Sequence, residues 1–572
     1  MKASGLSVSG IILGVPLPGY GSVESTSFQP NAHILISPEQ GVLLTIPIPE
    51  VGQNTRTALA MIMADELGAD LHTVNLKQAG PDKALGFQMA GASAGLKRSY
   101  PTIRLAAATA RHMLIQAAAK QWGVGPESCR TESSHVLGPD AKKISFEDIA
   151  LKASEIPLPE NPELKLPKEF KYIGKEIHVL DSKEIGMGRT RFAIDAMPDG
   201  VRFAVLKRCP VLDGTLVSFN AKEAESLPGV VDILKVEDAI AVIAVNTWIA
   251  MQAAERLEVV WDYGPNASVS TASHVQAQKA AVADPEKTGF TRGDFQSAFE
   301  GSTHQLDQSF SAPFLCHAPM EPPVCTAWYH DGELEIWTGC QSLHQLYDAL
   351  PDYAGLPNDK ITFHQMRMGG GFGRKLEHDF IIEALRVARR VDYPVKLMFT
   401  KADDIRHSSY RAADRYRYRV GLDKNGYPKA LQEISCRSAR TWRASKFAFH
   451  FNHVERKFTD LPLPLISGPY RGPHDNVSCF TQQSMTDAMA ESCGIDRIEY
   501  RLAMLGDSEA LSQLGWPAVP YEDPIMARLL KIVRRRSNWK ASPNYGYGVA
   551  FFEKNESKKD ANSRHKKSSL LR

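Results

Sequence analysis

Residues 369–374, Gly-Gly-Gly-Phe-Gly-Arg, are the most glycine-rich stretch of the chain and lie between a segment of strand character and one of helical periodicity. Glycine lets the backbone approach a ligand closely and leaves the N–H donors unhindered. Position 374 is Arg, and no Gly-Lys-Ser/Thr sequence follows. The stretch therefore matches neither a dinucleotide fingerprint nor a P-loop. Two interpretations stay open: contact with a ligand, or a turn that needs glycine for steric reasons.

His317 and Glu321 belong to a second candidate stretch, residues 316–323, Cys-His-Ala-Pro-Met-Glu-Pro-Pro. Imidazole and carboxylate groups can ligate a metal, and together with His330 they suggest a zinc-dependent hydrolase as one hypothesis. The prolines, however, forbid a helix that would present both side chains on one face. We expect a rigid loop that lines a cavity, and no metal held by the protein's own side chains.

Two further polar side chains lie at turns. Gln341 follows a predicted strand that ends at Trp337, and Arg471 is framed by the turn residues of 468–473, Gly-Pro-Tyr-Arg-Gly-Pro. An amide at a strand end can donate to an oxo group or can satisfy the backbone. A guanidinium in such a frame suits an anionic ligand, but it can equally pack across the turn.

Two stretches of small residues precede predicted helices. One is Val51-Gly52-Gln53, and the other is residues 90–95, Ala-Gly-Ala-Ser-Ala-Gly, with Ser93 near its centre. Both place backbone N–H groups at a helix N-terminus, where phosphate groups bind readily. Ordinary helix capping is the alternative interpretation of each stretch.

The hydrophobic pattern predicts the elements that position these residues. A hairpin is expected from His33–Ile36 and Val42–Ile48, and helices from Thr55–Leu67 and Arg104–Trp122, the latter closed by Gly123. The proline-rich residues 157–167 are the best linker candidate. Short strands alternate with helices over 186–262, which predicts a mixed α+β module. Further strands and helices are expected over 325–329, 334–337, 345–354, 361–366 and 377–391.

Composition narrows the function classes. The 572 residues include 67 Lys+Arg and 65 Asp+Glu, so the net charge of +2 argues against a general polyanion-binding protein. No apolar run reaches the ~18–20 residues that a membrane span needs. The eight cysteines show neither CxxC nor iron–sulfur spacing. Redox chemistry would therefore require an imported cofactor or a partner chain.

Taken together and in this order, residues 317–322, Gln341, 369–374 and 468–473 resemble the molybdenum-binding subunit of the xanthine oxidase family. Val51-Gly52-Gln53 precedes these motifs, which is similar to one branch of the family: the isoquinoline 1-oxidoreductase large subunit and membrane-associated aldehyde dehydrogenases. In that branch the chain order looks permuted relative to xanthine dehydrogenase. Asp487 and Arg501 also match the branch. The resemblance covers about residues 30 to 553.

The resemblance implies an α+β fold, that of a multidomain molybdenum-hydroxylase large subunit with a hammerhead-like α+β module between molybdopterin-binding domains. The expected parts are the remnant of an export leader over 1–29, a permuted molybdopterin-binding half over 30–170, the hammerhead-like domain over 186–265, a molybdopterin-binding domain over 300–553 and a disordered basic tail over 554–572. The implied cofactor is molybdopterin cytosine dinucleotide. Iron–sulfur clusters of the [2Fe-2S] type would lie only on a small partner subunit, with a cytochrome as a candidate electron acceptor.

By the same resemblance, Gln341 would donate a hydrogen bond to the molybdenum oxo or sulfido group, and Arg471 would line the active-site cavity or meet the pterin. Phe372 and Gly373 would lie against the apical face of the metal. The other cofactor-binding residues implied are Gly52, Gln53, Ser93, Gly370, Gly371 and Arg374. The implied reaction is hydroxylation of an N-heterocycle or oxidation of an aldehyde.

Several positions depart from the family pattern. No Gly-x-Gly-Glu motif, which carries the family's general base, follows Glu553, so the alternative expectation is a truncated, catalytically inactive paralogue. Asn54 and Ala92 stand where glycine is usual, and Gln483 and Ala488 each replace a usual Glu. Residues 2–6, Lys-Ala-Ser-Gly-Leu, resemble the sequence that follows a twin-arginine pair, which implies a periplasmic or membrane-associated protein if such a signal lies upstream and a cytoplasmic one otherwise.

Overall fold

The computed structural model describes residues 28–437, 446–461, 465–473, 475–539, 547–553 and 568–571. The predicted leader over 1–29 lies almost wholly outside these residues. Contacts divide the chain into two compact units. The first unit consists of the described parts of Met1–Gly264 and His317–Ser408, and the second of those of Pro265–Cys316 and Ser409–Arg572. We describe each unit by itself.

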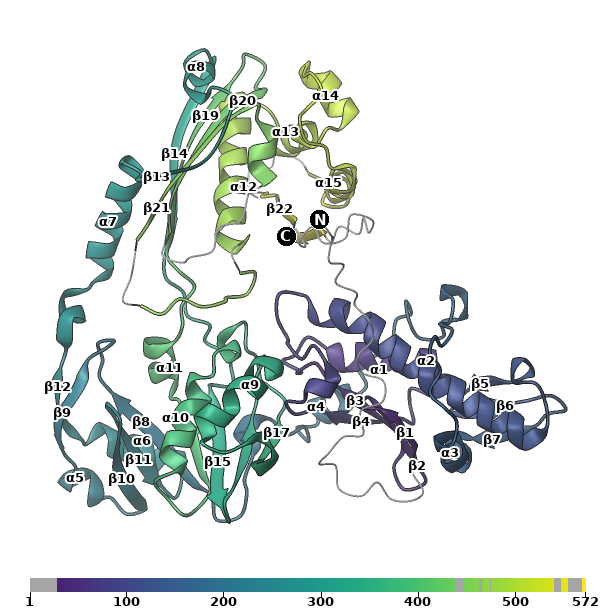
Figure 1. Ribbon diagram of the computed structural model, residues 1–572. Helices are drawn as coiled ribbons and strands as arrows, with labels where there is room; N and C mark the ends of the chain where they lie inside the picture. Colours follow the sequence, from purple (N-terminus) through teal and green to yellow (C-terminus); the bar gives the residue numbers. More distant parts are fainter. Residues whose placement is uncertain are drawn as a thin grey trace, which may run out of the picture. The chain divides into compact units, whose positions relative to one another are not determined.

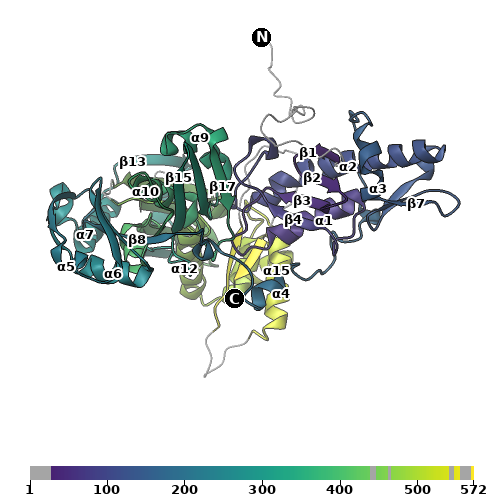
Figure 2. The same cartoon turned by 90° about the horizontal axis from the view of Figure 1, so that it is seen from below.

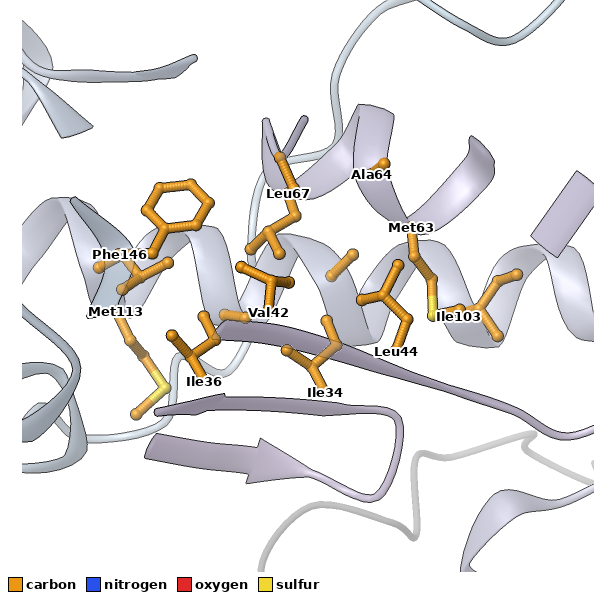
Figure 3. Packing of buried hydrophobic residues seen from close by; sticks show 14 of the residues in the cluster. Ile34, Ile36, Val42, Leu44, Met63, Ala64, Leu67, Ile103, Met113 and Phe146 are labelled. Atoms are coloured by element: carbon orange, nitrogen blue, oxygen red, sulfur yellow. The ribbon is translucent and has the colours of Figure 1, made fainter. Parts of the chain in front are cut away.

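The first unit begins with a four-stranded sheet covered by two helices. In order across the sheet the strands are β1 (Phe28–Asn31), β2 (Ile34–Ser37), β3 (Gly41–Ile46) and β4 (Asn75–Gln78), and the helices are α1 (Thr55–Leu67) and α2 (Gly95–Trp122). Antiparallel pairing of β2 with β3 confirms the predicted hairpin, and β4 adds to β3 in parallel. Figure 3 shows the side chains of Ile34, Ile36, Val42 and Leu44 pointing from the strands toward Met63, Ile103 and Met113 of the helices.

Helix α1 has the predicted bounds, whereas α2 begins nine residues before the predicted Arg104. The added residues include Gly95 and Pro101, which are poor helix formers, so sequence periodicity gives no signal there. Burial of Ser99 and Ile103 against the core supplies the stabilisation instead. Gly123 ends the helix in the left-handed conformation, as expected.

A small three-stranded sheet and a short helix follow α2. They consist of β5 (Arg130–Glu132), β6 (His135–Leu137), β7 (Lys143–Ser145) and α3 (Phe146–Ser154). Strands of three residues are too short to show a period in the sequence, and they were not predicted. The hydroxyl of Ser145 accepts the Asp148 N–H at 3.1 Å and caps α3.

The end of the proline-rich linker candidate and the residues that follow it are held against α1. The buried carboxylate of Asp65 accepts the N–H groups of Lys171, Tyr172 and Ile173 at 2.7, 2.9 and 2.6 Å. The neighbouring Glu66 accepts the N–H of Lys165 at 2.8 Å. We call residues 163–173 the strap, because two adjacent acidic residues of α1 fasten it.

A seven-stranded sheet forms the rest of the first unit's framework. In spatial order its strands are β10 (Val230–Val236), β11 (Ala239–Ala244), β8 (Arg202–Arg208), β18 (Val395–Met398), β15 (Val324–His330), β16 (Glu333–Thr338) and β17 (Ile361–Gln365). Helices α9 (Leu343–Ala354) and α10 (Asp379–Ala388) pack on one face, and both views place them beside β15 and β17 (Figures 1 and 2). Helix α6 (Thr247–Glu255) covers the other face of β8 and β11.

Two of the strands predicted over 186–265, β10 and β11, are therefore part of a larger sheet together with β8, whereas the third pairs within a separate two-stranded sheet. β8 pairs in parallel with β18, which joins the module's strands to those of residues 324–398. The remaining short elements here are β9 (Thr215–Asn220), β12 (Glu258–Asp262), α4 (Ser182–Gly186), α5 (Lys222–Glu225) and α11 (Lys401–His407).

The second unit consists of a five-stranded sheet and six helices among the described residues. Across the sheet the strands are β13 (Lys287–Arg292), β21 (His453–Asp460), β20 (Pro428–Arg437), β19 (Asp414–Leu422) and β14 (His304–Ala312). The helices are α7 (Thr271–Ala283), α8 (Phe295–Glu300), α12 (Asp475–Ser492), α13 (Arg497–Met504), α14 (Ser508–Leu514) and α15 (Pro524–Arg536). Tyr418 and Leu431 of the sheet pack with Met485 of α12 and Tyr500 of α13 in its core.

Toward the C-terminus, β22 (Ala550–Glu553) pairs antiparallel with β23 (Ser568–Leu571). The described part of the predicted disordered tail thus forms a strand, and the rest of 554–572 lies outside the described residues. No helix in the described ranges is long and apolar enough to cross a bilayer.

Candidate functional site

Gln341 lies in the turn between β16 and α9 and is only 4% exposed. Its Nε2 donates to the carbonyl of Ala90 at 2.7 Å, and its Oε1 accepts the N–H of Gly373 at 3.2 Å. Its backbone is fixed as well, because the N–H donates to the Lys375 carbonyl at 2.8 Å and the carbonyl accepts the Ala90 N–H at 2.8 Å. The side chain is therefore held in one place by two segments that lie far from it in the sequence.

The glycine loop, residues 369–374, wraps closely around Gln341. A Cβ atom on Gly371 would lie 2.3 Å from Gln341 Oε1 and 3.0 Å from Val51 Cγ2, so only glycine fits at this position. Gly370 and Gly373 have φ of 97° and 110°, a backbone region that strongly favours glycine. Phe372 also has a positive φ of 57°, and its side chain is 42% exposed. The loop is therefore a steric turn that also presents an exposed aromatic ring, and its contact with a ligand stays a prediction.

The turn before α1 adjoins the glycine loop through Val51 and through a hydrogen bond from Met368 N–H to the Glu50 carbonyl at 3.1 Å. The Glu50 carboxylate, 2% exposed, accepts the N–H groups of Gly52, Asn54 and Arg56 at 2.9, 3.0 and 3.1 Å. The negative charge that the helix N-terminus favours is thus supplied by the chain itself.

The side chain of Gln53 bonds within its own turn. Its Nε2 donates to the Pro49 carbonyl at 2.8 Å, and its Oε1 accepts the Val51 N–H at 2.7 Å. The sequence placed Gly52 and Gln53 among ligand-binding groups. The structure places both at the exposed surface beside the glycine loop, with the donors of the Gln53 side chain directed inward.

The turn before α2 contacts Gln341 through Ala90. The Ala90 N–H donates to the Gln341 backbone carbonyl, and the Ala90 carbonyl accepts from the Gln341 side chain. Ala92 and Ser93 are exposed and have φ of 52° and 57°, while the first residue before α2, Ala94, makes no side-chain cap. A backbone in this conformation gathers N–H groups at the start of the 28-residue helix. Ser93 therefore lies where the sequence predicts it, at an exposed helix N-terminus next to Gln341's partner.

The guanidinium of Arg374 turns away from the exposed side of the loop. It is fully buried and bonds to both carboxylate oxygens of Asp379 at 2.7 Å and to Asp404 at 2.8 Å. Burial lowers the pKa of Arg374, but the hydrogen bonds and charges of the two carboxylates outweigh it and raise the pKa above its ordinary value. The side chain of Arg374 is thus an internal anchor for the loop, and the cofactor contact of residue 374 stays a prediction.

Residues 316–323 form an irregular loop, as their prolines predict. The buried Glu321 is bonded to Lys375 and to the N–H groups of Gly369 and Ile194, at 2.9 and 3.1 Å for the two N–H groups. Within the part of the chain that the structure describes, no group of three or more His, Cys, Asp or Glu side chains could hold a metal ion. The zinc-hydrolase hypothesis, built on His317, His330 and Glu321, finds no ligand set there.

Arg471 lies in the second unit, in the turn before α12, and its side chain is exposed. Its carbonyl accepts the Asn476 Nδ2–H at 3.0 Å. In the same unit, the buried Arg501 donates to Asp487 at 2.7 Å and to Gln483 Oε1 at 2.9 Å. Gln483, noted above as a replacement for Glu, thus contacts the family-matching arginine with an uncharged acceptor.

Sequence reasoning missed the side chains that fasten these turns: Glu50, Lys375, Asp379 and Asp404. Glu321 was noticed only as a potential metal ligand. For Glu50, Lys375 and Asp379 a signal was present in the pattern, because each is a charged residue next to an apolar or glycine-rich run. Such a residue is buried only when it is paired.

Comparisons with known proteins identify the domains and relatives of the chain. Two models of molybdopterin cofactor-binding domains match the chain, one over residues 2–183 and one over residues 275–438. The isoquinoline 1-oxidoreductase subunit beta of Brevundimonas diminuta is 25% identical, with 94% of this chain and 76% of the relative covered. The membrane-bound aldehyde dehydrogenase (pyrroloquinoline-quinone) of Gluconacetobacter polyoxogenes is 29% identical, with 71% of this chain covered.

The chain spans about half, 54%, of the length of that aldehyde dehydrogenase. Among solved structures, quinoline 2-oxidoreductase from Pseudomonas putida 86 shares the fold, with a TM-score of 0.53, 17% identity and coverage of 67% of this chain and 58% of that one. The domain matches, these relatives and the shared fold agree with the order of the motifs. The chain belongs to the molybdopterin-binding large subunits of the xanthine oxidase family.

Proposed function

We propose that the chain is the large subunit of a molybdenum-dependent oxidoreductase that hydroxylates an N-heterocycle of the isoquinoline type or oxidises an aldehyde. The observation that carries this proposal is the fixed position of Gln341 where the turns before α1 and α2 meet the glycine loop. When bound, a molybdenum–pterin cofactor supplies the two-electron chemistry that amino-acid side chains lack.

The residues present fit such a group. The close approach of Gly371 to Gln341 leaves no room for a side chain, and the exposed sides of Gly52, Ser93 and Phe372 border the place where the buried amide is held. An amide nitrogen carries two N–H groups, and one of those on Gln341 donates to Ala90. We assign the second N–H to an oxygen or sulfur atom of the cofactor. Gly52, Gln53, Ser93, Gly370 and Gly373 are the residues that would hold the pterin and its nucleotide.

We further propose the cytosine dinucleotide form of molybdopterin, and an iron–sulfur small subunit that accepts the electrons. The relatives' names support the two substrate classes, isoquinoline-like heterocycles and aldehydes. Phe372, 42% exposed, and Met320, 89% exposed, offer an apolar surface next to the glycine loop that suits a ring or an apolar aldehyde. A periplasmic or membrane-associated location follows if a twin-arginine signal precedes the chain. Arg471 stays a candidate for contact with the substrate or the pterin.

The experiment is to co-express the chain with a candidate iron–sulfur small subunit and to measure molybdenum and cytidine nucleotide per chain. Dye reduction is then measured with isoquinoline and with an aldehyde. We expect bound cofactor and turnover with one of the two substrates. A protein free of molybdenum and pterin that reduces no dye with either substrate, although its small subunit is bound, would contradict the proposal.

A paired substitution tests the role of Gln341. Gln341→Ala should lower turnover by about 10²–10³, the usual effect of removing one donor at a reacting centre. The control is Gln365→Ala. Gln365 is also a buried amide in this region, but its Oε1 accepts the Cys340 N–H and its Nε2 donates to the Cys340 carbonyl, both at 3.2 Å. Equal losses of turnover in both variants would remove the special role of Gln341.

A further inference from the structure

Glu321 joins two loops by their backbones. Its own N–H donates to the Gly369 carbonyl at 3.1 Å, and its Oε2 accepts the Gly369 N–H at 2.9 Å. Its Oε1 accepts the N–H of Ile194 at 3.1 Å. The approach is tight, since a Cβ atom on Gly369 would lie 2.7 Å from Glu321 Cβ. The start of the glycine loop is therefore fixed at two points by a single residue.

Lys375 connects this clamp with Gln341. Its ammonium group is 1% exposed and donates to Glu321 Oε2, while its backbone carbonyl accepts the Gln341 N–H at 2.8 Å. Lys375 thus binds the carboxylate of Glu321, which fixes the start of the glycine loop. It also binds the backbone of Gln341, which the loop encloses. Lys375 itself directly follows the end of the loop.

Stability alone gives no reason for such a buried pair. Taking two charges out of water costs about as much as their attraction returns, and apolar residues of similar size are often at least as stable. The chemistry of the acceptor explains the choice better. Both oxygens of Glu321 accept backbone N–H groups, which an ionised carboxylate does and an amide cannot, because an amide presents one oxygen and one NH₂ group. The ammonium of Lys375 places the opposite charge directly beside this carboxylate.

We propose that Glu321 and Lys375 are positioning residues that set the distance between Gln341 and the glycine loop. What the loop binds rests on the function proposed above, but the positioning itself is a property of the chain and is measurable without a cofactor. The pair acts on the reacting centre only through Gln341 and through the N–H groups of Gly369 and Gly373.

The test uses the full chain with Lys375→Met, Glu321→Gln and the double variant. Lys360→Met with Glu333→Gln is the matched control, an exposed ion pair of 3.1 Å in the same unit. Hydrogen exchange of the peptide that spans 366–378 reports the protection of the Gly369 and Gly373 N–H groups. The thermal midpoint and the molybdenum and pterin content are measured on the same samples.

We expect each single variant to speed exchange in this peptide by about tenfold or more, the effect of losing roughly one net hydrogen bond. Cofactor content should fall in parallel. The double variant removes the unpaired buried charge, so its thermal midpoint should recover relative to the single variants, whereas fast exchange and low cofactor content should persist. The control pair should change none of these quantities.

In the double variant, exchange protection and cofactor content could recover along with the thermal midpoint. That result would overturn the positioning role and leave only a stabilising one. If a single variant does not accumulate as folded protein, the double variant decides, because it contains no unpaired charge. Wild-type chain without molybdenum or pterin would contradict the proposed function, and the exchange data would still judge the role of Glu321 and Lys375.

Discussion

At the level of single residues, contact with Gln341 explains why glycine is required at position 371. The backbone there does not have a positive φ, so the requirement is steric and not conformational. Gly371→Ala would place its Cβ 2.3 Å from Gln341 Oε1, and the amide or the loop must move.

We expect Gly371→Ala to lower the free energy of unfolding of the first unit by about 1–3 kcal/mol, as overpacking of a tight interior does, and to lower cofactor content. Chemical denaturation and metal analysis measure the two effects. The matched control is Gly186→Ala, since no atom lies within 4 Å of a Cβ built there. Similar losses in both variants would show that the cause is not contact with Gln341.

Two departures from the family pattern acquire a physical meaning in the structure. Asn54 and Ala92 replace usual glycines, and both have positive φ, 62° and 52°. Asparagine tolerates this conformation far better than alanine does. The strain should therefore be concentrated at Ala92.

Ala92→Gly should raise the free energy of unfolding by about 0.5 kcal/mol, because relief of roughly 1–2 kcal/mol of backbone strain is partly offset by the greater freedom of glycine in the unfolded chain. Asn54→Gly should give a smaller change or none. The measurement is urea unfolding of both variants beside the wild type. A loss of stability in Ala92→Gly would show that the left-handed backbone at this position carries no strain.

At the level of elements, the apolar spacing predicted the hairpin of β2 and β3, where alternate residues of β3 are buried, and the bounds of α1, although that helix is buried on nearly all sides. The start of α2 and the pairing of β8 with β18 could not be predicted in this way. The first depends on tertiary burial of Ser99 and Ile103, and the second joins strands separated by almost two hundred residues. The motifs likewise predicted that Gln341 and the glycine loop matter, but not which charged residues fasten them.

The strap shows how hydrogen bonds fasten a segment that begins within the linker candidate. Its one proline, Pro167, carries no N–H, but the N–H groups of residues 171–173 all donate to Asp65. Asp65→Ala leaves these donors without their acceptor, so we expect a loss of about 2–4 kcal/mol in the free energy of unfolding, from charged hydrogen bonds of about 1.5–3 kcal/mol each that are not additive. Limited proteolysis should then cut within 163–173. Glu160→Ala, an exposed position just before the strap, is the control and should leave the proteolysis rate unchanged.

At the level of the whole molecule, each unit contains a buried histidine whose pKa lies far below its ordinary value. Burial lowers the pKa of His33 in the first unit and of His450 in the second, from 6.5 to about 4 in both. In the unfolded chain both imidazoles bind a proton near pH 6.5, whereas the folded units bind it only near pH 4. The unfolded state therefore holds more protons between these values, and stability falls as the pH falls through this range.

Each pKa shift of about 2.5 pH units corresponds to roughly 3 kcal/mol in the free energy of unfolding. This stability is fully present above pH 6.5 and is lost by about pH 4. Because one of these two histidines lies in each unit, both units should weaken together in mild acid, before most carboxylates are protonated. His33→Gln should remove about one proton from the pH dependence of the first unit's unfolding free energy, measured by urea unfolding at several pH values between 4 and 7. The exposed His72, replaced by Gln, should leave that dependence unchanged. If His33→Gln unfolds with the wild-type pH slope, the acid sensitivity of the first unit arises from groups other than this buried imidazole.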